Sequence, residues 1–176
     1  MKSKRRLVGS GSQEMNRLFT EANAAWDKGE LQQAFVLFTQ AARLGDRSSQ
    51  LDLGYFYDQG LSVKKDKKKA LEWYRRAYRQ GDAGAANNIA TVYRDFGNTR
   101  RMLWWFRQAA AMGDLDVLLD LGKRYEEGLA VPRNAARAKV FYRRVLADKC
   151  ATEDDKGEAT TRLAGLRERA GAPRKR

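Results

Sequence analysis

Apolar residues recur at the spacing of a helix face in the stretch 70–77, where Ala70, Trp73, Tyr74 and Ala77 lie three or four positions apart. The same arrangement begins three more times along the chain, at Ala34, Met102 and Ala138. The four copies are separated by 36, 32 and 36 residues. Each copy predicts an amphipathic helix, and the near-constant spacing predicts an array of structural repeats.

A second helix is predicted before each of these four. Its pattern is a small residue followed three positions later by a large one, and the matching pairs are Gly54 with Tyr57, Ala90 with Tyr93, and Gly122 with Tyr125; Ala22 with Ala25 is the weaker first copy. A small residue lets the partner helix approach closely. We therefore expect Gly54 and Gly122 to lie at close helix–helix approaches, where a larger side chain would overpack the pair.

Turn signals separate the helices. Gly-Asp occurs at 45–46, 81–82 and 113–114, which suits a glycine that ends one helix and an aspartate that caps the next. Two of the four helix pairs have a longer connection, and both connections contain Gly-Leu-x-Val, at 60–63 and 128–131. We expect each of these to be an extended loop whose valine packs beneath the pair.

The pattern predicts an all-α solenoid of helix-turn-helix repeats. The repeats are expected at about 15–46, 47–82, 83–114 and 115–149, followed by a C-terminal capping helix at 152–170. Together they form one repeat domain over residues 13–170. The ends, 1–12 and 171–176, are strongly basic and contain no acid, so they are predicted to be disordered basic tails.

Several of these residues resemble a known family. The residues Leu53, Gly54, Tyr57, Gly60, Val63, Asp66, Lys69, Ala70, Trp73, Tyr74, Ala77, Gly81 and Asp82 resemble one Sel-1-like repeat, a relative of the tetratricopeptide repeat. A second copy is similar at Leu121, Gly122, Tyr125, Gly128, Val131, Ala138, Phe141 and Tyr142. The copies at 15–46 and 83–114 look closer to tetratricopeptide repeats. The resemblance implies a right-handed superhelix whose inner face, made by the first helices, binds partners.

The chain offers little catalytic chemistry. It contains no histidine and one cysteine, Cys150, which has no metal-ligating neighbour at a useful spacing. The Gly-Ser-Gly-Ser stretch at 9–12 lacks the lysine of a phosphate-binding loop. We therefore expect no enzyme activity, no cofactor and no metal. A single cysteine, no apolar run of membrane-spanning length and no secretory signal pattern favour a cytoplasmic protein.

The inner face of the array is the first candidate for a partner-binding groove. In repeat register its expected lining is Phe19, Asn23, Trp26, Leu51, Tyr55, Asp58, Asn87, Thr91, Arg94, Leu119, Lys123 and Glu126. Relatives that clamp a terminal carboxylate need a lysine where Phe19 stands and an asparagine where Asp52 stands, so such a clamp is not expected here. Our first hypothesis is a non-enzymatic scaffold that holds a protein or peptide in this groove.

Charge gives the alternative hypothesis. The net charge is +13, and a lysine-rich loop is followed by a stripe of arginines at equivalent repeat positions. The residues of this possible basic surface are Lys64, Lys65, Lys67, Lys68, Arg75, Arg107 and Arg143, and Trp104 is a possible exposed aromatic. With the tails, they could bind nucleic acid non-specifically or an anionic membrane. Phosphate-driven binding weakens steeply with salt, which would separate the two hypotheses.

Overall fold

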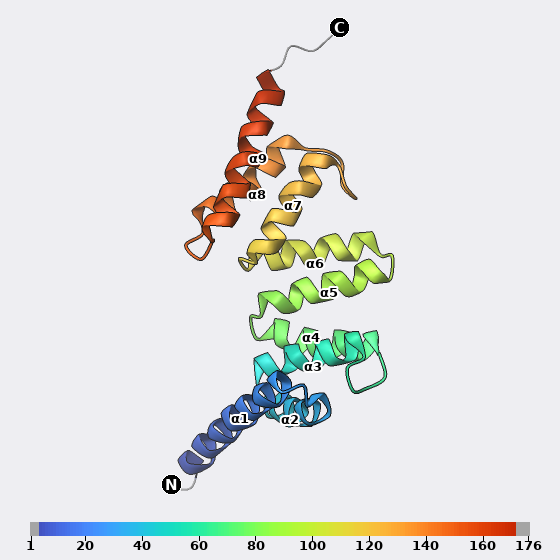
Figure 1. Cartoon of the computed structure of the whole chain (residues 1–176), viewed down its shortest axis with the longest axis vertical. Helices are drawn as coiled ribbons and strands as arrows, with labels where there is room; N and C mark the ends of the chain where they lie inside the picture. The colour runs from blue at the N-terminus through green and yellow to red at the C-terminus, as the bar shows by residue number, and fades with distance from the viewer. Residues whose placement is uncertain (1–3, 172–176) are drawn as a thin grey trace. The chain divides into compact units, whose positions relative to one another are not determined.

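The structure is a computed structural model that describes residues 4–171, with side chains described from residue 11 to 167. Figure 1 shows helices joined by turns and loops, with no strand among the described residues. The helices are α1 Lys4–Asp27, α2 Leu31–Leu44, α3 Arg47–Gln59, α4 Lys67–Arg79, α5 Ala83–Asp95, α6 Thr99–Ala111, α7 Leu115–Glu127, α8 Ala135–Ala147 and α9 Glu153–Gly171. The α-solenoid of helical repeats predicted from the sequence is confirmed.

The chain divides into two compact units, Met1–Gly97 and Asn98–Arg176. The first contains α1 to α5 and the second α6 to α9. The boundary falls in the turn between α5 and α6, inside the predicted third repeat, which differs from the single domain expected over 13–170. In a repeat array each element is stabilised by its immediate neighbours, so an array can divide without losing its helices.

The N-terminal helix is longer than the sequence predicted. Helix α1 begins at Lys4, so most of the expected tail at 1–12 is helical. Extending an existing helix carries no nucleation cost, and the glycines at 9 and 11 each weaken it by only about 1 kcal/mol. The remainder of that tail, residues 1–3, lies outside the described residues. So does all but the first residue of the predicted C-terminal tail, because α9 ends at Gly171.

The Gly-Asp turns behave as predicted. Asp46, Asp82 and Asp114 each cap the following helix by accepting a hydrogen bond from the backbone N–H three residues on. The N–H···O distances are 2.6 Å from Ser49, 2.9 Å from Ala85 and 3.0 Å from Val117. The preceding glycines have the positive φ that an L-residue avoids, for example 106° at Gly45.

The predicted close approaches are also confirmed. A Cβ built on Gly54 would lie 2.5 Å from Cδ1 of Tyr74, and one built on Gly122 would lie still closer to the ring of Tyr142. Both tyrosines are fully buried. Each glycine on the first helix of its pair therefore makes room for the tyrosine ring of the second.

The two long loops share their backbone geometry. In each, one residue that is not glycine has a positive φ, 55° at Ser62 and 61° at Ala130. Each loop is closed by a backbone hydrogen bond to the tyrosine of the first helix, 2.8 Å from Asp66 to Tyr57 and 2.7 Å from Asn134 to Tyr125. The loop valines pack inward as expected, since Val131 is buried and Val63 is half-buried.

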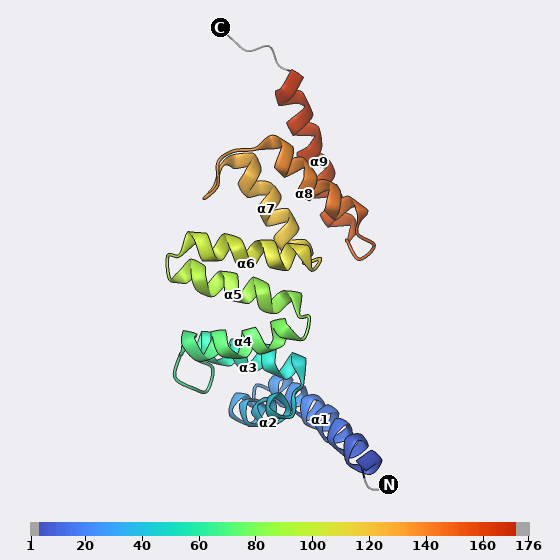
Figure 2. The ribbon, with the colours of Figure 1, turned by 180° about the vertical axis from the view of Figure 1, so that it is seen from behind.

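The core of the first unit is aromatic at its N-terminal end. Helices α1 and α2 lie side by side in both views (Figures 1 and 2) and pack around Ala22, Ala34 and Phe38. Phe56 of α3 closes this cluster, and Phe19 and Trp26 of α1 pack against its edge. The cluster therefore places aromatic rings of α1 where they can also reach the surface.

Candidate protein-binding site

Trp26 joins the buried core of the first unit to its surface. Its ring centroid lies 5.1 Å from that of buried Phe56 in an edge-on contact, and 6.0 Å from that of Tyr55. Tyr55 is 41% exposed, although it stands between two buried residues in α3. Aromatic rings at 4.5–7 Å separations attract one another beyond their area of contact. Tyr55 is thus an exposed ring whose orientation is held by a half-buried one.

The other predicted groove residues of the first unit extend this surface along α1 and α5. Phe19 and Asn23 are half-buried, and the Asn23 amide donates a 2.8 Å hydrogen bond to the Phe19 carbonyl. Leu51 of α3 lies beside α5, where its Cδ2 would be 4.0 Å from a Cβ at Gly84. Asn87 and Thr91 of α5 are also half-buried. We call the set Phe19, Asn23, Trp26, Leu51, Tyr55, Asn87 and Thr91 the aromatic face.

A titratable carboxyl lies next to Tyr55. Asp52 stands three residues before it on α3, at the spacing that places both on one side of a helix. Burial, and then the negative charges of Asp46 and Asp82, raise the pKa of Asp52 to about 6. Its charge therefore changes close to neutral pH. The sequence showed Asp52 only as a departure from a carboxylate clamp, because its burial depends on the packing of neighbouring repeats.

Two predicted groove residues at the other end of these helices are arranged differently. Asp58 is only 4% exposed and accepts a 2.9 Å hydrogen bond from the Lys67 ammonium group. Lys67 also contacts Asp95, and although burial opposes its charge, the two carboxylates raise its pKa. Arg94 is exposed, with its Nε 3.9 Å from the Asp95 carboxylate. Asp58 is thus a structural ion-pair residue without access to a partner.

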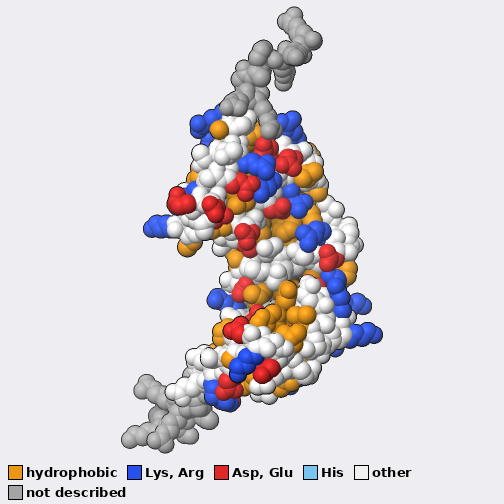
Figure 3. Space-filling model, viewed as in Figure 1, with side chains coloured by type: hydrophobic (Ala, Val, Ile, Leu, Met, Phe, Trp, Pro, Cys, Tyr) orange, Lys and Arg blue, Asp and Glu red, His pale blue; other side chains and the backbone are white. Residues whose placement is uncertain are grey.

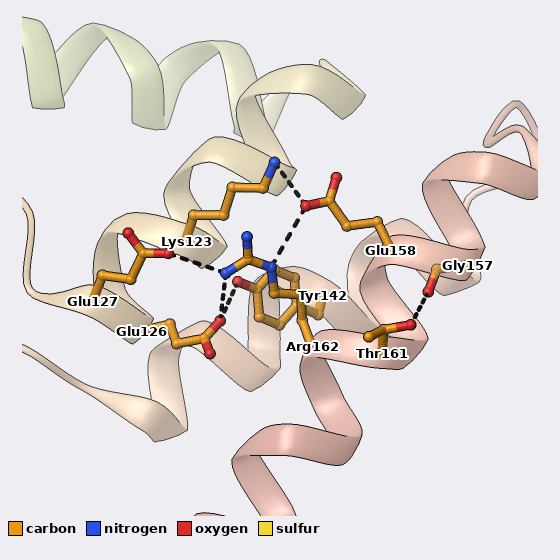
Figure 4. Close-up of polar contacts among 8 residues, drawn as sticks. All are labelled: Lys123, Glu126, Glu127, Tyr142, Gly157, Glu158, Thr161 and Arg162. Carbon is orange, nitrogen blue, oxygen red and sulfur yellow. Dashed lines mark hydrogen bonds and ion pairs between the residues drawn. The ribbon is translucent and has the colours of Figure 1, made fainter.

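In the second unit, helix α9 covers the predicted groove residues of α7. The Lys123 ammonium group lies 2.8 Å from the Glu158 carboxylate, and the Arg162 guanidinium lies 3.0 Å from the carboxylate of Glu127. Figure 4 shows both contacts between α7 and α9. Arg162 also reaches Glu126, at 3.4 Å. The capping helix therefore occupies the place on α7 where a bound partner was expected.

Two more of the predicted groove residues of α7 are buried. Leu119 is 7% exposed and Glu126 is 3% exposed. The Tyr142 hydroxyl donates a 2.8 Å hydrogen bond to Glu126 (Figure 4), and burial together with this carboxylate raises the pKa of the tyrosine. Leu119 and Glu126 are thus inaccessible, and we leave them out of the proposed surface together with the paired Lys123. The capping helix at 152–170 was predicted, but its contacts with α7 were not, because residues 152–170 lack the repeat pattern.

The predicted basic surface separates into two kinds of residue. Lys64, Lys65, Lys68 and Arg143 are exposed, while Lys67 is held between carboxylates as described. Two arginines of the stripe instead bind the first helix of the next repeat, with distances of 2.9 Å from Arg75 to the Tyr93 hydroxyl and 2.8 Å from Arg107 to the Tyr125 hydroxyl. Part of the stripe therefore contributes to the packing of successive helices.

Trp104 and Arg137 are two further residues at the surface of the second unit, one predicted as a possible exposed aromatic and one not singled out from the sequence. Trp104 is 50% exposed, and its ring lies edge-on to Trp105 at 4.7 Å. Arg137 was not singled out in the sequence, yet it donates a 3.2 Å hydrogen bond to the Tyr125 hydroxyl that also accepts from Arg107. Its repeat position carries Lys69 in the other long-loop copy, which is the signal that could have identified it.

Residues 4–171 contain no group of three side chains arranged to hold a metal ion. Among the same residues, no helix combines the length and apolar character needed to cross a bilayer.

Comparison with known proteins agrees with the repeat pattern. The sequence model of the Sel1 repeat matches residues 28–46, 47–82, 100–114 and 116–144, which together exceed half of the chain. The second and fourth of these segments contain the two long-loop pairs.

Two curated relatives are 28% identical to this chain. One is the ERAD-associated E3 ubiquitin-protein ligase component HRD3 of Candida glabrata, matched over 126 residues that cover 67% of this chain and 15% of the relative. The other is chitin synthase regulatory factor 1 of Schizosaccharomyces pombe, matched over 137 residues that cover 74% of this chain and 29% of the relative. The chain thus spans less than a third of the length of either.

Solved structures share the fold over nearly the whole chain. A Sel1 repeat protein from Oxalobacter formigenes has a TM-score of 0.69 and 25% identity, covering 97% of this chain and 72% of that protein. A protective antigen of uropathogenic Escherichia coli strains, which displays the same repeat fold, has a TM-score of 0.67 and 24% identity, covering 92% and 35%. With the family match across all four repeats, these likenesses lead to one conclusion: the chain belongs to the Sel1 repeat family.

Proposed function

We propose that this chain is a non-enzymatic scaffold module that binds a protein or peptide on the aromatic face of its first unit. The observation that carries the proposal is the exposed Tyr55 ring held by Trp26 above a buried aromatic core. Large aromatic side chains with little rotational freedom are typical anchors of protein interfaces. Sel1 repeats generally mediate protein–protein interaction, and the two curated relatives are named as a ligase component and a regulatory factor.

The chemistry of the aromatic face favours a mixed contact. The rings of Trp26 and Tyr55 suit an apolar side chain of the partner, while Asn87 and Thr91 offer hydrogen bonds. Asp52 adds a carboxylate that is mostly ionised above pH 6 and attracts a basic group. An extended or helical peptide with one apolar and one basic side chain would satisfy all three features.

Site-specific photocrosslinking tests this proposal. A photoreactive amino acid replaces Tyr55, or in the control Val36 of α2, which is similarly exposed at 43%. Each protein is irradiated in lysate of the source organism and adducts are identified by mass spectrometry. We expect a discrete adduct from position 55 that disappears when Trp26→Ala is added, and none of that identity from position 36. Equal adducts from both positions, or an adduct insensitive to Trp26→Ala, would contradict the proposal.

A second candidate function is polyanion binding by the loop before α4. Lys64 and Lys65 are exposed on this loop, Lys68 is exposed in the first turn of α4, and the chain has a net charge of +13. Oligonucleotide affinity measured between about 50 and 200 mM salt tests it, because contacts to phosphates release counterions and fade over that range. A triple change of these lysines to glutamine must reduce both the affinity and its salt dependence. Unchanged affinity would exclude this loop as the binding site.

A further inference from the structure

A second surface in the second unit joins two hollows through a shared arginine. One hollow, of about 380 Å³, is lined by Arg107, Tyr125, Arg137, Val140 and Phe141. The other, of about 530 Å³, is lined by Asn98, Arg100, Arg101, Trp104 and Arg107. Because Arg107 lines both, the hollows adjoin at this side chain, over α6 and α8, and neither is lined by the α7 residues Lys123, Glu126 and Glu127 that contact α9. Each is of the size that accommodates a few side chains of a ligand.

A tyrosine hydroxyl positions two guanidinium groups at the centre of this surface. Tyr125, only 3% exposed, accepts 2.8 Å and 3.2 Å hydrogen bonds from Arg107 and Arg137. Each guanidinium has five N–H donors, so most remain for a ligand. Burial opposes ionisation of Tyr125, but the two arginines outweigh it and hold its pKa below the usual value, as expected in a positive local field.

The two helices that carry these arginines contain no acidic residue at all. Helix α6 has three arginines, and helix α8 has Arg137, Lys139, Arg143 and Arg144. In the Lys123–Glu158 and Arg124–Asp120 contacts of this unit, the carboxylates lie on α9 and α7. A ligand that approaches over α6 and α8 therefore meets only basic residues on these two helices, and their positive charge attracts an anionic group.

Exposed apolar side chains lie among the arginines. Trp104 is 50% exposed and Val140 is 53% exposed, each lining one of the two hollows. The edge-on contact with Trp105 limits the motion of the Trp104 ring. The surface thus combines fixed positive groups with two apolar contact points, a pairing that neither a free anion nor a purely apolar ligand would use fully.

We propose that this arginine–tryptophan surface, defined as Arg100, Trp104, Arg107, Arg137 and Val140, binds an acidic peptide segment that carries a hydrophobic side chain. Carboxylates of the segment pair with Arg107 and Arg137, whose planar donors match carboxylate geometry. The hydrophobic side chain contacts Trp104 or Val140. The inference takes from the proposed function only that the partner is a protein, and it requires nothing of the aromatic face.

The composition of the surface favours a peptide over a polynucleotide. Single-stranded nucleic acid is bound by aromatic rings on which successive bases stack. Among the described residues of α6 and α8, the large hydrophobic side chains that are exposed are one aromatic, Trp104, and two aliphatic ones, Val140 and Leu146. Aliphatic groups beside arginines suit the side chains of a peptide better than a series of bases.

Fluorescence anisotropy with labelled peptides tests the proposal on the full chain. The probe is a peptide rich in Asp and Glu that contains one Leu and one Phe, and the matched probe has Gly at those two positions. We expect Arg107→Gln with Arg137→Gln to weaken binding of the first probe about tenfold or more. The control pair, Arg79→Gln with Arg143→Gln, removes the same charge from exposed positions outside both hollows and should change affinity less than about twofold. Circular dichroism checks that all variants remain folded.

Two further variants make the result specific. Trp104→Ala must weaken binding of the probe with Leu and Phe but not that of the probe with Gly. Trp26→Ala with Tyr55→Ala, which disables the aromatic face, must leave the affinity unchanged. If that pair abolishes binding, the peptide binds the first unit and this inference fails while the proposed function stands.

Other outcomes would also overturn the inference. Equal losses in the two arginine pairs would show that only net charge matters, and no loss in either would show that the surface does not bind. Tighter binding of an oligothymidylate than of the peptide, lost in Arg107→Gln with Arg137→Gln, would make the surface a nucleic-acid site. Dimers in sedimentation that this variant disrupts would assign it to a second copy of the chain.

Discussion

The two long-loop repeats, 47–82 and 115–149, use one backbone design with different polar interiors. Both pack a tyrosine ring against a glycine of the facing helix. In the second of these repeats the hydroxyl of Tyr142 donates to Glu126 at 2.8 Å. In the first, the hydroxyl of Tyr74 is fully buried and has no hydrogen-bond partner. The same packing position thus carries a satisfied polar group in one repeat and an unsatisfied one in the other.

The acidic residue four positions after each glycine explains the difference. Asp58 occupies this position in the first long-loop repeat, and Glu126 in the second. Lys67 binds Asp58 from the start of α4, whereas the equivalent position of α8 is Ala135, which has no charge. With no such lysine and a longer side chain, Glu126 reaches both Tyr142 and Arg162 of α9.

The acidic residues of α7 also contact the capping helix. Arg162 of α9 pairs with Glu126 and Glu127 (Figure 4), while α9 itself packs mainly on α8. In the first unit the corresponding charge is neutralised locally by Lys67, and Tyr55 of α3 remains 41% exposed. Figure 3 shows hydrophobic side chains gathered at the surface at the level of α3 and α4. The two long-loop repeats therefore share a backbone, and their polar side chains differ in the contacts that they make with neighbouring helices.

The largest expected changes in stability come from the glycine–tyrosine contact that both long-loop repeats share. Gly54→Leu and Gly122→Leu should each destabilise the protein by about 3 kcal/mol, because the new side chain overlaps a fully buried tyrosine ring. Gly165→Ala in α9 is the control, since its Cβ would meet no atom within 4 Å, and it should stabilise by about 0.5–1 kcal/mol. Urea unfolding measures all three. Neutral results at both buried glycines would show that the close approaches are wrong.

Replacing the acidic residues Glu126 and Asp58 should destabilise the two long-loop repeats by different amounts. Glu126→Ala should cost about 2–3 kcal/mol, because it leaves the buried Tyr142 hydroxyl without its acceptor and removes one partner of Arg162. Asp58→Ala should cost only about 1 kcal/mol, since Lys67 retains Asp95. Chemical denaturation of both variants gives the difference, and equal costs would argue against distinct polar interiors.

Removing the hydroxyl of Tyr74 and removing that of Tyr142 should change the free energy of unfolding in opposite directions. Tyr74→Phe should stabilise the protein by about 1 kcal/mol, because the lost hydroxyl is buried without a partner. Tyr142→Phe should destabilise it by about 1 kcal/mol, because a hydrogen bond to Glu126 is lost. Thermal melts of Tyr74→Phe and Tyr142→Phe measure the two changes in stability. Shifts of the same sign would mean that the two hydroxyls are equally well accommodated.

The smallest expected effect concerns Asp52, beside the open face of α3. Its pKa is raised to about 6 in the folded protein against an unfolded value near 3.9, so its ionisation opposes folding. The wild type should match Asp52→Asn below about pH 4 and lose stability relative to it as the pH rises from about 4 to 6. Above that range it should remain about 1 kcal/mol less stable, because solvent around the half-buried carboxylate reduces the roughly 3 kcal/mol that a pKa difference of this size would give. Unfolding at a series of pH values checks this. A difference that does not vary with pH would contradict the raised pKa.

Particular residues show why the fold was predictable and the site less so. The Gly-Asp turns and the glycines facing tyrosine act within one repeat, so the sequence pattern of that repeat is sufficient to predict them. The cover over Glu126 and Lys123 depends on α9, which lies outside the repeat pattern and makes contacts through individual charged side chains. The pairing of Arg107 and Arg137 on Tyr125 likewise depends on three helices: the repeat register points to Arg137 through Lys69, but it does not show that both arginines share one hydroxyl.

The most direct test of the account compares equivalent residues of the open and covered faces. Tyr55 on α3 and Lys123 on α7 each follow the glycine of their repeat by one position. Affinity for the protein captured at position 55 is measured for Tyr55→Ala and Lys123→Ala by isothermal titration calorimetry. We predict that Tyr55→Ala weakens binding about tenfold or more, while Lys123→Ala changes it less than about twofold. A loss of binding in Lys123→Ala with none in Tyr55→Ala would contradict it.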